Sequence, residues 1–463
     1  MRFLSLVCLF LCLYTCLVAA PAADSTQSYL KIRNIHIEGN KKTRTYIVYR
    51  ELLVRPGDSI ALRNLSGALL RNKQRVQNLQ LFTDVTVSLQ DWRKDSADLV
   101  VKVHERWYIF PQLFVKLADR NFNVWWVDQH HSLDRINLGV VLSHDNFTGM
   151  SDVASIGAQF GYTRKFSTSY YMPYLDRQLK HGMGGGFFYS INREINYATS
   201  QNKQQFVRLD SAWATTDWGA DLFYTYRPKF NSKHTFSVGY NYKDISPGVQ
   251  NLNPNYFANG ATSISYPEVY YRFDFDNTDS KQYPLKGYRI WGTVLNRGLG
   301  LNSNVNQTYV HNYTGVFVPL NKKFYSSFIF RGRLSFPEQQ AYVFNRAMGY
   351  GYDYIRGYEY YVIDGSHFGI LKTNLKYKLI DMRIPVPWIP FINNIPLRAF
   401  AKTYADIGYG RNINPGNSFL NNRMLAGYGV GLDVVTLYDL NIRMEYTFNN
   451  IGQKGLFLQF ISE

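Results

Sequence analysis

Residues 440–448 read LNIRMEYTF, and apolar and polar side chains alternate along the whole stretch. In an extended chain, successive side chains point to opposite faces of the sheet. One face of this segment is therefore apolar, and the other carries Asn441, Arg443, Glu445 and Thr447. The pattern predicts a β-strand with one apolar face and one polar, partly charged face.

The same alternation recurs from about Trp107 to the C-terminus. Segments 236–243, 269–276 and 327–336 all alternate, turns separate them, and no helical period replaces the pattern. Such segments of roughly ten residues are typical of a transmembrane antiparallel β-barrel. We therefore expect a mainly β chain with a barrel of about 16 strands over residues 107–463. The strand assignment within 203–229 stays ambiguous.

Composition separates this interpretation from that of a water-soluble β-sandwich, which also alternates but turns its apolar face inward. The chain has 37 Tyr and 31 Phe, and only 18% of its residues are charged. An aromatic excess with charges kept on the opposite strand face favours a sheet that faces lipid. Backbone groups in lipid must all be paired, so we expect the sheet to close.

The first residues predict a secretory signal peptide over residues 1–23. A basic start precedes the apolar run 3–18, and small residues follow it. A membrane anchor and a lipid-modified Cys16 are the alternatives. Cys8, Cys12 and Cys16 are the three cysteines of the chain. The exported part would therefore hold no disulfide and no zinc–thiolate site.

The formal net charge is +17, and the basic residues are spread through strand-like segments instead of clustering on a helix. This distribution argues against nucleic-acid binding and favours a basic lumen or contacts with lipid headgroups. A basic lumen could form an anion-selective pore, or it could attract acidic loops of a client polypeptide. The bases expected on the lumen face are Arg331, Arg333, Lys372, Lys376, Lys378, Arg398, Lys402 and Arg443.

Residues 24–106 predict a separate small α/β domain. An alternating segment at 31–38 is followed by helical periodicity over 43–54 and 61–79, and then by two strand-like segments between 82 and 103. The expected order is strand, helix, helix, strand, strand.

Motifs of common enzymes are missing: the sequence contains no HExxH, GxSxG or Walker-type pattern. Asp128, His130, His131 and Asp134 could bind a metal, but a solvated loop is the simpler interpretation. We expect no enzyme activity, no catalytic residue, no metal and no cofactor.

The N-terminal region resembles a polypeptide-transport-associated (POTRA) domain. The resemblance lies in Ile37-Glu38-Gly39-Asn40, in the pair of helices, and in the segment 81–87 that follows them. It implies a helix pair packed on a three-stranded sheet, and binding of extended peptides by strand addition at a sheet edge. The alternative is a plain α/β module that holds the barrel in place.

The barrel region resembles the BamA/TamA family. Ile355-Arg356-Gly357-Tyr358 matches the family's V/I-R-G-F/Y motif, which lies on a loop folded back into the lumen, here at about 337–367. Tyr404-Ala405-Asp406-Ile407-Gly408 matches its F-x-D-x-G strand motif. The resemblance implies an ion pair between Arg356 and Asp406, with Tyr404 and Gly408 beside it, since a guanidinium fork suits a carboxylate.

Two further segments support this resemblance, and two features depart from it. Residues 274–287 resemble the D-x-x-D…P-x-x-G hairpin, and residues 453–460 fit a C-terminal β-signal with Gly455, Leu458 and Phe460. Only one POTRA-like domain fits before the barrel. Asn374 and the residues after it stand where a glutamate partner for the arginine is expected, which points to an accessory paralogue.

The resemblance implies an assembly and insertion factor in the bacterial outer membrane, with the POTRA-like domain in the periplasm. That domain would capture client polypeptides, and a seam between the first and last strands would insert them. Implied partners are unfolded outer-membrane or secreted polypeptides, outer-membrane lipids and accessory lipoproteins, but not nucleic acid. A pore that exports one partner protein and a structural surface barrel remain the alternatives.

Overall fold

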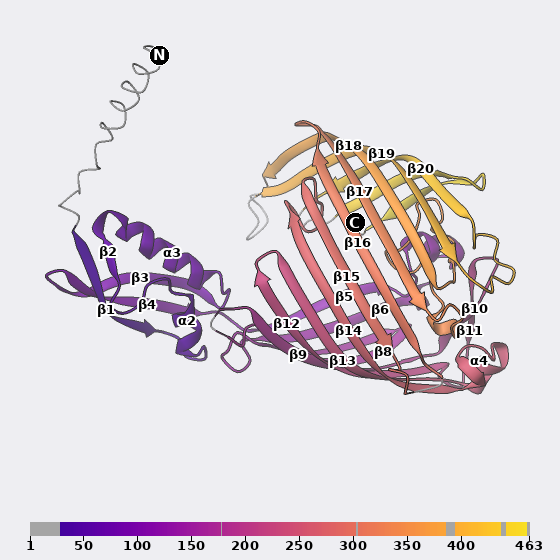
Figure 1. Ribbon diagram of the computed structural model, residues 1–463, viewed down its shortest axis with the longest axis horizontal. Helices are drawn as coiled ribbons and strands as arrows, with labels where there is room; N and C mark the ends of the chain where they lie inside the picture. Colours follow the sequence, from indigo (N-terminus) through magenta and orange to yellow (C-terminus); the bar gives the residue numbers. More distant parts are fainter. Residues whose placement is uncertain (1–27, 177, 302–303, 386–393, 437–440, 461–463) are drawn as a thin grey trace, which may run out of the picture. The chain divides into compact units, whose positions relative to one another are not determined.

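The computed structural model (Figure 1) describes residues 28–460, except for 177, 302–303, 386–393 and 437–440. The predicted signal peptide, residues 1–23, and Leu440 of the alternating segment lie outside the described residues. The chain divides into two compact units, and the division falls between Trp107 and Tyr108.

The N-terminal unit is a four-stranded sheet with two α-helices, α3 against β3 and α2 against β1. The strand order is β2-β1-β4-β3, with β1 and β4 parallel. Both helices are shorter than the sequence predicted, and a short strand that pairs with β1 precedes the second helical region. The elements are β1 Tyr29–Glu38, α2 Thr45–Glu51, β2 Ser59–Ala61, η2 Leu62–Asn64, α3 Leu65–Gln77, β3 Phe82–Arg93 and β4 Ser96–Glu105.

The second unit is one antiparallel sheet of sixteen strands, in which each strand pairs with the strands next to it in the sheet order. This confirms the predicted strand number and the mainly β fold. The strands are β5 Ile109–Leu117, β6 Ile136–Asp145, β7 Val153–Gly161, β8 Thr163–Met172, β9 His181–Asn192, β12 Thr215–Lys229, β13 Ser232–Ile245, β14 Ser263–Thr278, β15 Gly287–Arg297, β16 Gln307–Pro319, β17 Phe324–Phe336, β18 His367–Pro385, β19 Asn394–Arg411, β20 Met424–Val435, β21 Asn441–Asn449 and β22 Lys454–Gln459.

The ambiguous region of the sequence contains two kinds of structure. Residues Lys203–Arg208 form β11, which pairs with β10 (Glu194–Ser200) in a separate hairpin, and β12 follows as a strand of the large sheet. In Figure 1 this hairpin and α4 lie at the same end of the barrel. The other short helices are η3 Val124–Asp128, η4 Leu133–Arg135, α4 Pro247–Leu252, η5 Ala258–Gly260 and η6 Tyr342–Phe344.

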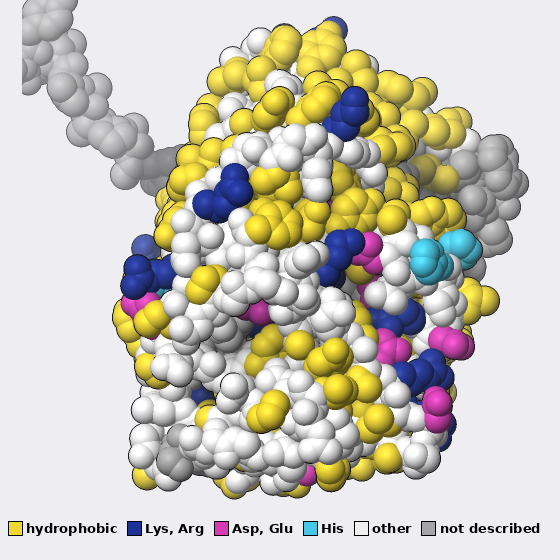
Figure 2. Space-filling view, turned by 90° about the vertical axis from the view of Figure 1, so that its right-hand side faces the viewer, with side chains coloured by type: hydrophobic (Ala, Val, Ile, Leu, Met, Phe, Trp, Pro, Cys, Tyr) yellow, Lys and Arg dark blue, Asp and Glu magenta, His cyan; other side chains and the backbone are white. Residues whose placement is uncertain are grey.

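Side chains segregate across the sheet as the alternation predicts. On β21, Arg443, Glu445 and Thr447 are buried, while Met444 and Tyr446 between them are exposed on the outer face. In Figure 2, hydrophobic side chains gather in the upper part of the view, where Figure 1 places β18 to β20. An apolar exterior around a polar interior is the arrangement of a membrane barrel. None of the described helices has the length and apolarity needed to cross a membrane.

The two end strands of the sheet, β5 and β22, define a seam. Among the described residues no ladder of backbone hydrogen bonds joins them, so the expected full closure is not formed at this place. Pro111 lies within β5 and pairs with Leu142 of β6. Proline has no N–H to donate and is tolerated in sheets mainly on edge strands, so its position agrees with β5 being an edge.

Candidate functional site

The connection between β17 and β18, residues 337–366, folds against the inner wall of the barrel, as the family resemblance implied for about 337–367. Its apolar side chains Met348, Ile355, Tyr358 and Ile363 share a buried cluster with four residues of the wall and of the connection before β20: Phe368, Ile370, Leu420 and Leu425. Burial of these side chains favours the inward position of the loop over a solvated one.

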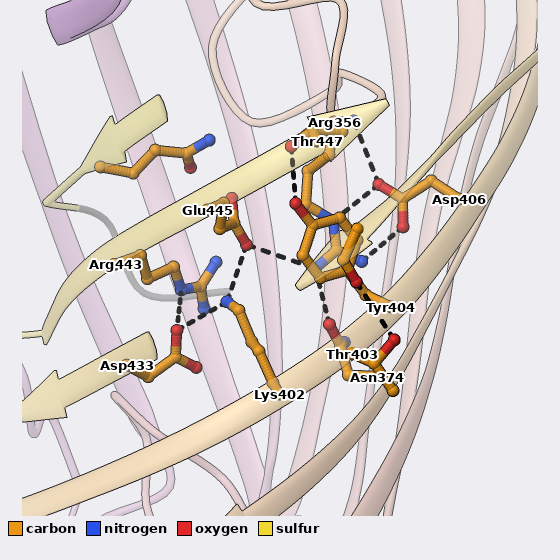
Figure 3. A network of polar contacts seen from close by, with 12 residues as sticks. Arg356, Asn374, Lys402, Thr403, Tyr404, Asp406, Asp433, Arg443, Glu445 and Thr447 are labelled. Carbon is orange, nitrogen blue, oxygen red and sulfur yellow. Dashed lines mark hydrogen bonds and ion pairs between the residues drawn. The ribbon is translucent and has the colours of Figure 1, made fainter. Parts of the chain in front are cut away.

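Arg356 projects from this loop into a clamp on the wall, and its side chain is fully buried. Nε donates a hydrogen bond to Oδ2 of Asp406 at 2.8 Å, and Nη2 pairs with Oδ1 of the same carboxylate. The backbone N–H of Arg356 also donates to Oδ2, at 3.1 Å. The ion pair expected from the resemblance is therefore formed as a two-pronged contact (Figure 3).

Tyr404 and Gly408 of the same strand shape the clamp. The guanidinium lies 3.8 Å from the centre of the Tyr404 ring, and the Tyr404 hydroxyl is 2.6 Å from Oγ1 of Thr447. A side chain at Gly408 would meet the Cδ1 atom of Ile355 at 2.6 Å, so glycine makes room for the loop. Tyr358 also holds the loop through its hydroxyl, which donates a hydrogen bond to Asn450.

Wall residues beyond β19 also contact Arg356, and the carbonyl oxygen of Thr373 accepts a hydrogen bond of 3.3 Å from Nη2. Two side chains contact Nη1, and the sequence did not assign either of them as a partner. Nη1 donates to Oδ1 of Asn374 at 2.6 Å and lies 3.4 Å from Oε1 of Glu445. The glutamate expected near Asn374 is absent from that strand, and Glu445 supplies a second carboxylate from β21 instead. Its place on the polar face of residues 440–448 was the signal that could have identified it.

A chain of polar contacts continues from Glu445 to the opposite end of the barrel. Nζ of Lys402 lies 2.7 Å from Glu445 and 2.6 Å from Asp433, and all three side chains are buried. Asp433 also accepts a hydrogen bond of 2.8 Å from the hydroxyl of Tyr283. Tyr283 belongs to the turn between β14 and β15, within the hairpin motif that the sequence indicated. The lumen loop and this turn therefore contact one continuous buried network.

We predict that Tyr283→Phe lowers barrel stability by about 1–3 kcal/mol, because it removes a hydrogen bond to a buried carboxylate. Packing of the ring against Phe400 is retained. The shift in the urea midpoint of unfolding in detergent measures the effect. Tyr325→Phe is the matched control, since Tyr325 also contacts Phe400 but its hydroxyl donates at an exposed place, to the backbone carbonyl of Lys322 at 3.2 Å. Equal shifts in both variants would contradict the prediction.

Acidic partners compensate the positive charges of the lumen face to a larger extent than the sequence suggested. Arg331 lies 3.3 Å from Asp353 of the loop, and Lys376 and Arg443 lie 4.0 and 3.9 Å from Asp433. Lys372 lies over the ring of Tyr354. Acidic groups of the wall and the loop therefore balance several of these charges, which weakens the interpretation as an anion-selective pore.

The predicted C-terminal β-signal forms the last strand and its end. Gly455 pairs with Thr447 and Leu458 with Met444, while Phe460 follows the strand and is about half exposed. On the seam side, the side chain of Asn123 bonds to the backbone of Leu458. The signal residues therefore lie at the seam and not at the arginine clamp.

The loop residues considered as metal ligands do not assemble. Asp128 pairs with Lys203 at 3.1 Å, and Asp134 lies 3.6 Å from Arg208. The described part of the chain contains no cluster of three or more histidine, cysteine or acidic residues arranged to hold a metal ion.

These features define a class of protein: a sixteen-stranded barrel, preceded by a POTRA-type domain, with an arginine loop anchored inside the lumen. Comparison with family models gives the same result. The POTRA model, described as surface antigen variable number repeat, matches residues 30–106, and the Omp85 superfamily domain matches residues 146–455. The second match covers more than half of the chain, so the chain belongs to the Omp85 superfamily.

Individual relatives agree with this family and confirm the resemblance to BamA. The outer membrane protein assembly factor BamA of Nitratidesulfovibrio vulgaris is 23% identical over 259 residues, which are 55% of this chain and 28% of that protein. This chain thus spans under a third of the length of that curated relative.

Two solved structures share the fold. The crystal structure of BamA from Haemophilus ducreyi lacking POTRA domains 1–3 has a TM-score of 0.67 at 14% identity, over 93% of this chain and 83% of that one. CdiB from Escherichia coli has a TM-score of 0.50 at 13% identity, over 93% of this chain and 75% of its own. At these identities the likeness concerns the fold alone.

Proposed function

We propose that the chain is an assembly and insertion factor of BamA/TamA type. The N-terminal unit captures client polypeptides, and the barrel inserts them at the seam between β5 and β22. The observation that carries the proposal is this seam, where sheet pairing between the end strands is absent from the described residues. Unpaired strand edges are templates for a further strand.

The N-terminal unit offers a second edge of the same kind. β3 has twelve residues and is an end strand of its sheet, and within the described part of the chain its one partner strand is β4. A long free edge can bind an extended peptide through backbone hydrogen bonds, with little dependence on its sequence. This tolerance suits a factor that handles many different client polypeptides.

The proposed location is the bacterial outer membrane, with the N-terminal unit in the periplasm. The proposed partners are unfolded outer-membrane or secreted polypeptides, outer-membrane lipids and accessory lipoproteins. Strand exchange at a sheet edge forms and breaks hydrogen bonds but no covalent bond. The proposal therefore needs no catalytic residue, no metal and no cofactor.

Depletion of the protein in its own cells tests the function. We expect the amounts of other barrels in the outer membrane to fall, and re-expression of the full chain to restore them. Unchanged amounts of all other barrels would contradict the assembly role. If the loss were confined to one secreted protein, the pore that exports a partner would replace it.

We predict that a photoreactive amino acid at Thr86, an exposed position of β3, crosslinks client polypeptides in intact cells. The matched control carries the same group at Gln74, an exposed position of α3, which is not part of the sheet. Mass spectrometry of the captured chains is expected to find outer-membrane polypeptides with the β3 probe and few with the helix probe. Equal capture by both would remove β3 as the binding edge.

A further inference from the structure

The connection that follows β5 reaches the edge of the last strand. Nδ2 of Asn123 donates a hydrogen bond of 3.1 Å to the carbonyl oxygen of Leu458. The backbone N–H of Leu458 in turn donates to Oδ1 of Asn123 at 3.0 Å. One side-chain amide, itself buried, thus holds both backbone groups of one strand residue.

This pattern copies a strand–strand contact. In an antiparallel pair, two opposite residues exchange an N–H···O bond in each direction. An asparagine side chain carries the same donor and acceptor as a peptide group. Asn123 therefore occupies, at Leu458, the position that a neighbouring strand would take. On its other side, Leu458 belongs to the ladder with β21.

The residues just before Asn123 tie the same connection to the lumen loop. Nη1 of Arg120 donates to the carbonyl oxygens of Gly349 and Tyr361, at 3.1 and 2.7 Å. Nδ2 of Asn121 donates to the carbonyl oxygen of Glu359 at 2.9 Å. We call the segment Arg120–Asn123 the clasp, because it joins the loop to the edge of β22.

An aromatic contact extends the clasp beyond the end of the strand. The rings of Phe122 and Phe460 are 5.6 Å apart and meet edge to face. Phe122 also stacks on Trp126, at 5.6 Å. The clasp therefore covers both the backbone edge at Leu458 and the aromatic residue that closes the C-terminal signal.

We propose that the clasp closes the seam by occupying the edge of β22, and that a client strand binds there only when Asn123 releases Leu458. This inference rests on the proposed insertion function and adds its control. The fitting partner is an extended polypeptide strand, because it presents the N–H and C=O that the Asn123 amide imitates. Release also breaks the link that the clasp makes between β22 and the loop that carries Arg356, while direct contacts such as Tyr354 with Gln459 remain.

The first test measures binding of a fluorescent peptide with the sequence of residues 453–460 to the purified full chain in detergent micelles. Asn123→Leu keeps the side-chain size and removes both hydrogen bonds. We expect it to bind the peptide about tenfold more tightly than the parent chain, since each lost bond contributes a few-fold. Asn123→Asp keeps the acceptor and loses the donor, so a smaller gain is expected.

Gln129→Leu is the matched control on the same connection, at a side chain for which the structure describes no hydrogen bond to β22. Its affinity is expected to equal that of the parent. If Asn123→Leu still shows the heat-dependent gel mobility of a folded barrel but binds no more tightly, the clasp is only an anchor for the connection and the inference is overturned.

A second test leaves the Asn123 amide unchanged. The native cysteines all lie within residues 1–23, so cysteines replacing Phe122 and Phe460 can be joined by a reversible bis-methanethiosulfonate reagent. We expect peptide binding to fall about tenfold when the two cysteines are joined and to recover on reduction. The joined clasp cannot leave β22, so the N–H and C=O groups of Leu458 cannot form their two hydrogen bonds with the peptide. Unchanged binding would overturn the inference.

The outcome is separable from that of the proposed function. Depletion that lowers other barrels, together with unchanged peptide affinity in Asn123→Leu, removes the clasp and leaves the assembly role. The opposite result is an increased peptide affinity in Asn123→Leu with normal amounts of other barrels after depletion. It supports the occupation of the β22 edge by the clasp and contradicts the assembly role.

Discussion

Arg356→Ala is expected to lower the stability of the barrel by about 3–5 kcal/mol, because it leaves a buried carboxylate without its partner. Asp406 loses both prongs of the guanidinium, and its side chain has no exposure to water. Asn374 loses its contact with Nη1 as well. The loop should then loosen around residue 356, because this buried ion pair with the wall is lost, whereas contacts such as Tyr358 with Asn450 and Asp353 with Arg331 remain.

Two measurements check this expectation on the purified barrel: the urea midpoint of unfolding, and the rate at which protease cuts within residues 337–366. Arg356→Lys keeps the charge but not the planar fork, so an intermediate loss is expected. Arg423→Ala, at an exposed arginine, is the control and should change neither measurement. A loop that stays protected in Arg356→Ala would contradict the anchoring role.

A paired variant separates anchoring from assembly. Replacing Arg356 and Asp406 together by leucine removes both charges, and well-packed apolar residues often recover the stability of a buried ion pair. If the double variant recovers the stability but, when expressed in depleted cells, does not restore the amounts of other barrels, then the placement of the loop matters for assembly. If assembly returns as well, the ion pair serves only to hold the barrel together.

The sequence was most informative where one physical rule acts locally. A strand between lipid and a polar lumen must alternate, so residues 440–448 already show the two faces and the strand count follows from repeats of the pattern. The contact of Arg356 with Asp406 came from the family resemblance, which supplied the pairing of two distant motifs. Ser59–Ala61 was missed because three residues are too few to display a period.

Other features depend on register, which the sequence does not display. Lys402, Asp433 and Glu445 lie on three successive strands, and they meet only because Lys402 pairs with Gly431 and Gly431 with Glu445. A shift of one position would turn a carboxylate toward the outer face. The contact of Asn123 with Leu458 joins a side chain to a backbone, and such a contact leaves no pattern in either segment.

Lys402→Met is expected to have the largest effect on stability among the single changes considered, about 3–5 kcal/mol or more, because one buried cation compensates two buried carboxylates. Its Nζ lies between Asp433 and Glu445, each within 2.7 Å. Without it the two carboxylates keep only longer contacts with basic groups, such as Arg356 at 3.4 Å and Arg443 at 3.9 Å. Methionine fills a similar volume, so the loss reports the charge and not a cavity.

The urea midpoint of the purified barrel measures the effect, and a second change identifies its cause. Adding Glu445→Gln to Lys402→Met removes one unpaired charge and is expected to recover a substantial part of the loss. Lys378→Met is the matched control on the neighbouring strand, since Lys378 pairs with the half-exposed Asp381. An accessible pair of this kind contributes about 1 kcal/mol or less. If the loss of stability in Lys402→Met is no larger than in this control, water reaches the network and screens its charges. The lumen loop and the turn at Tyr283 would then not be connected by buried ion pairs.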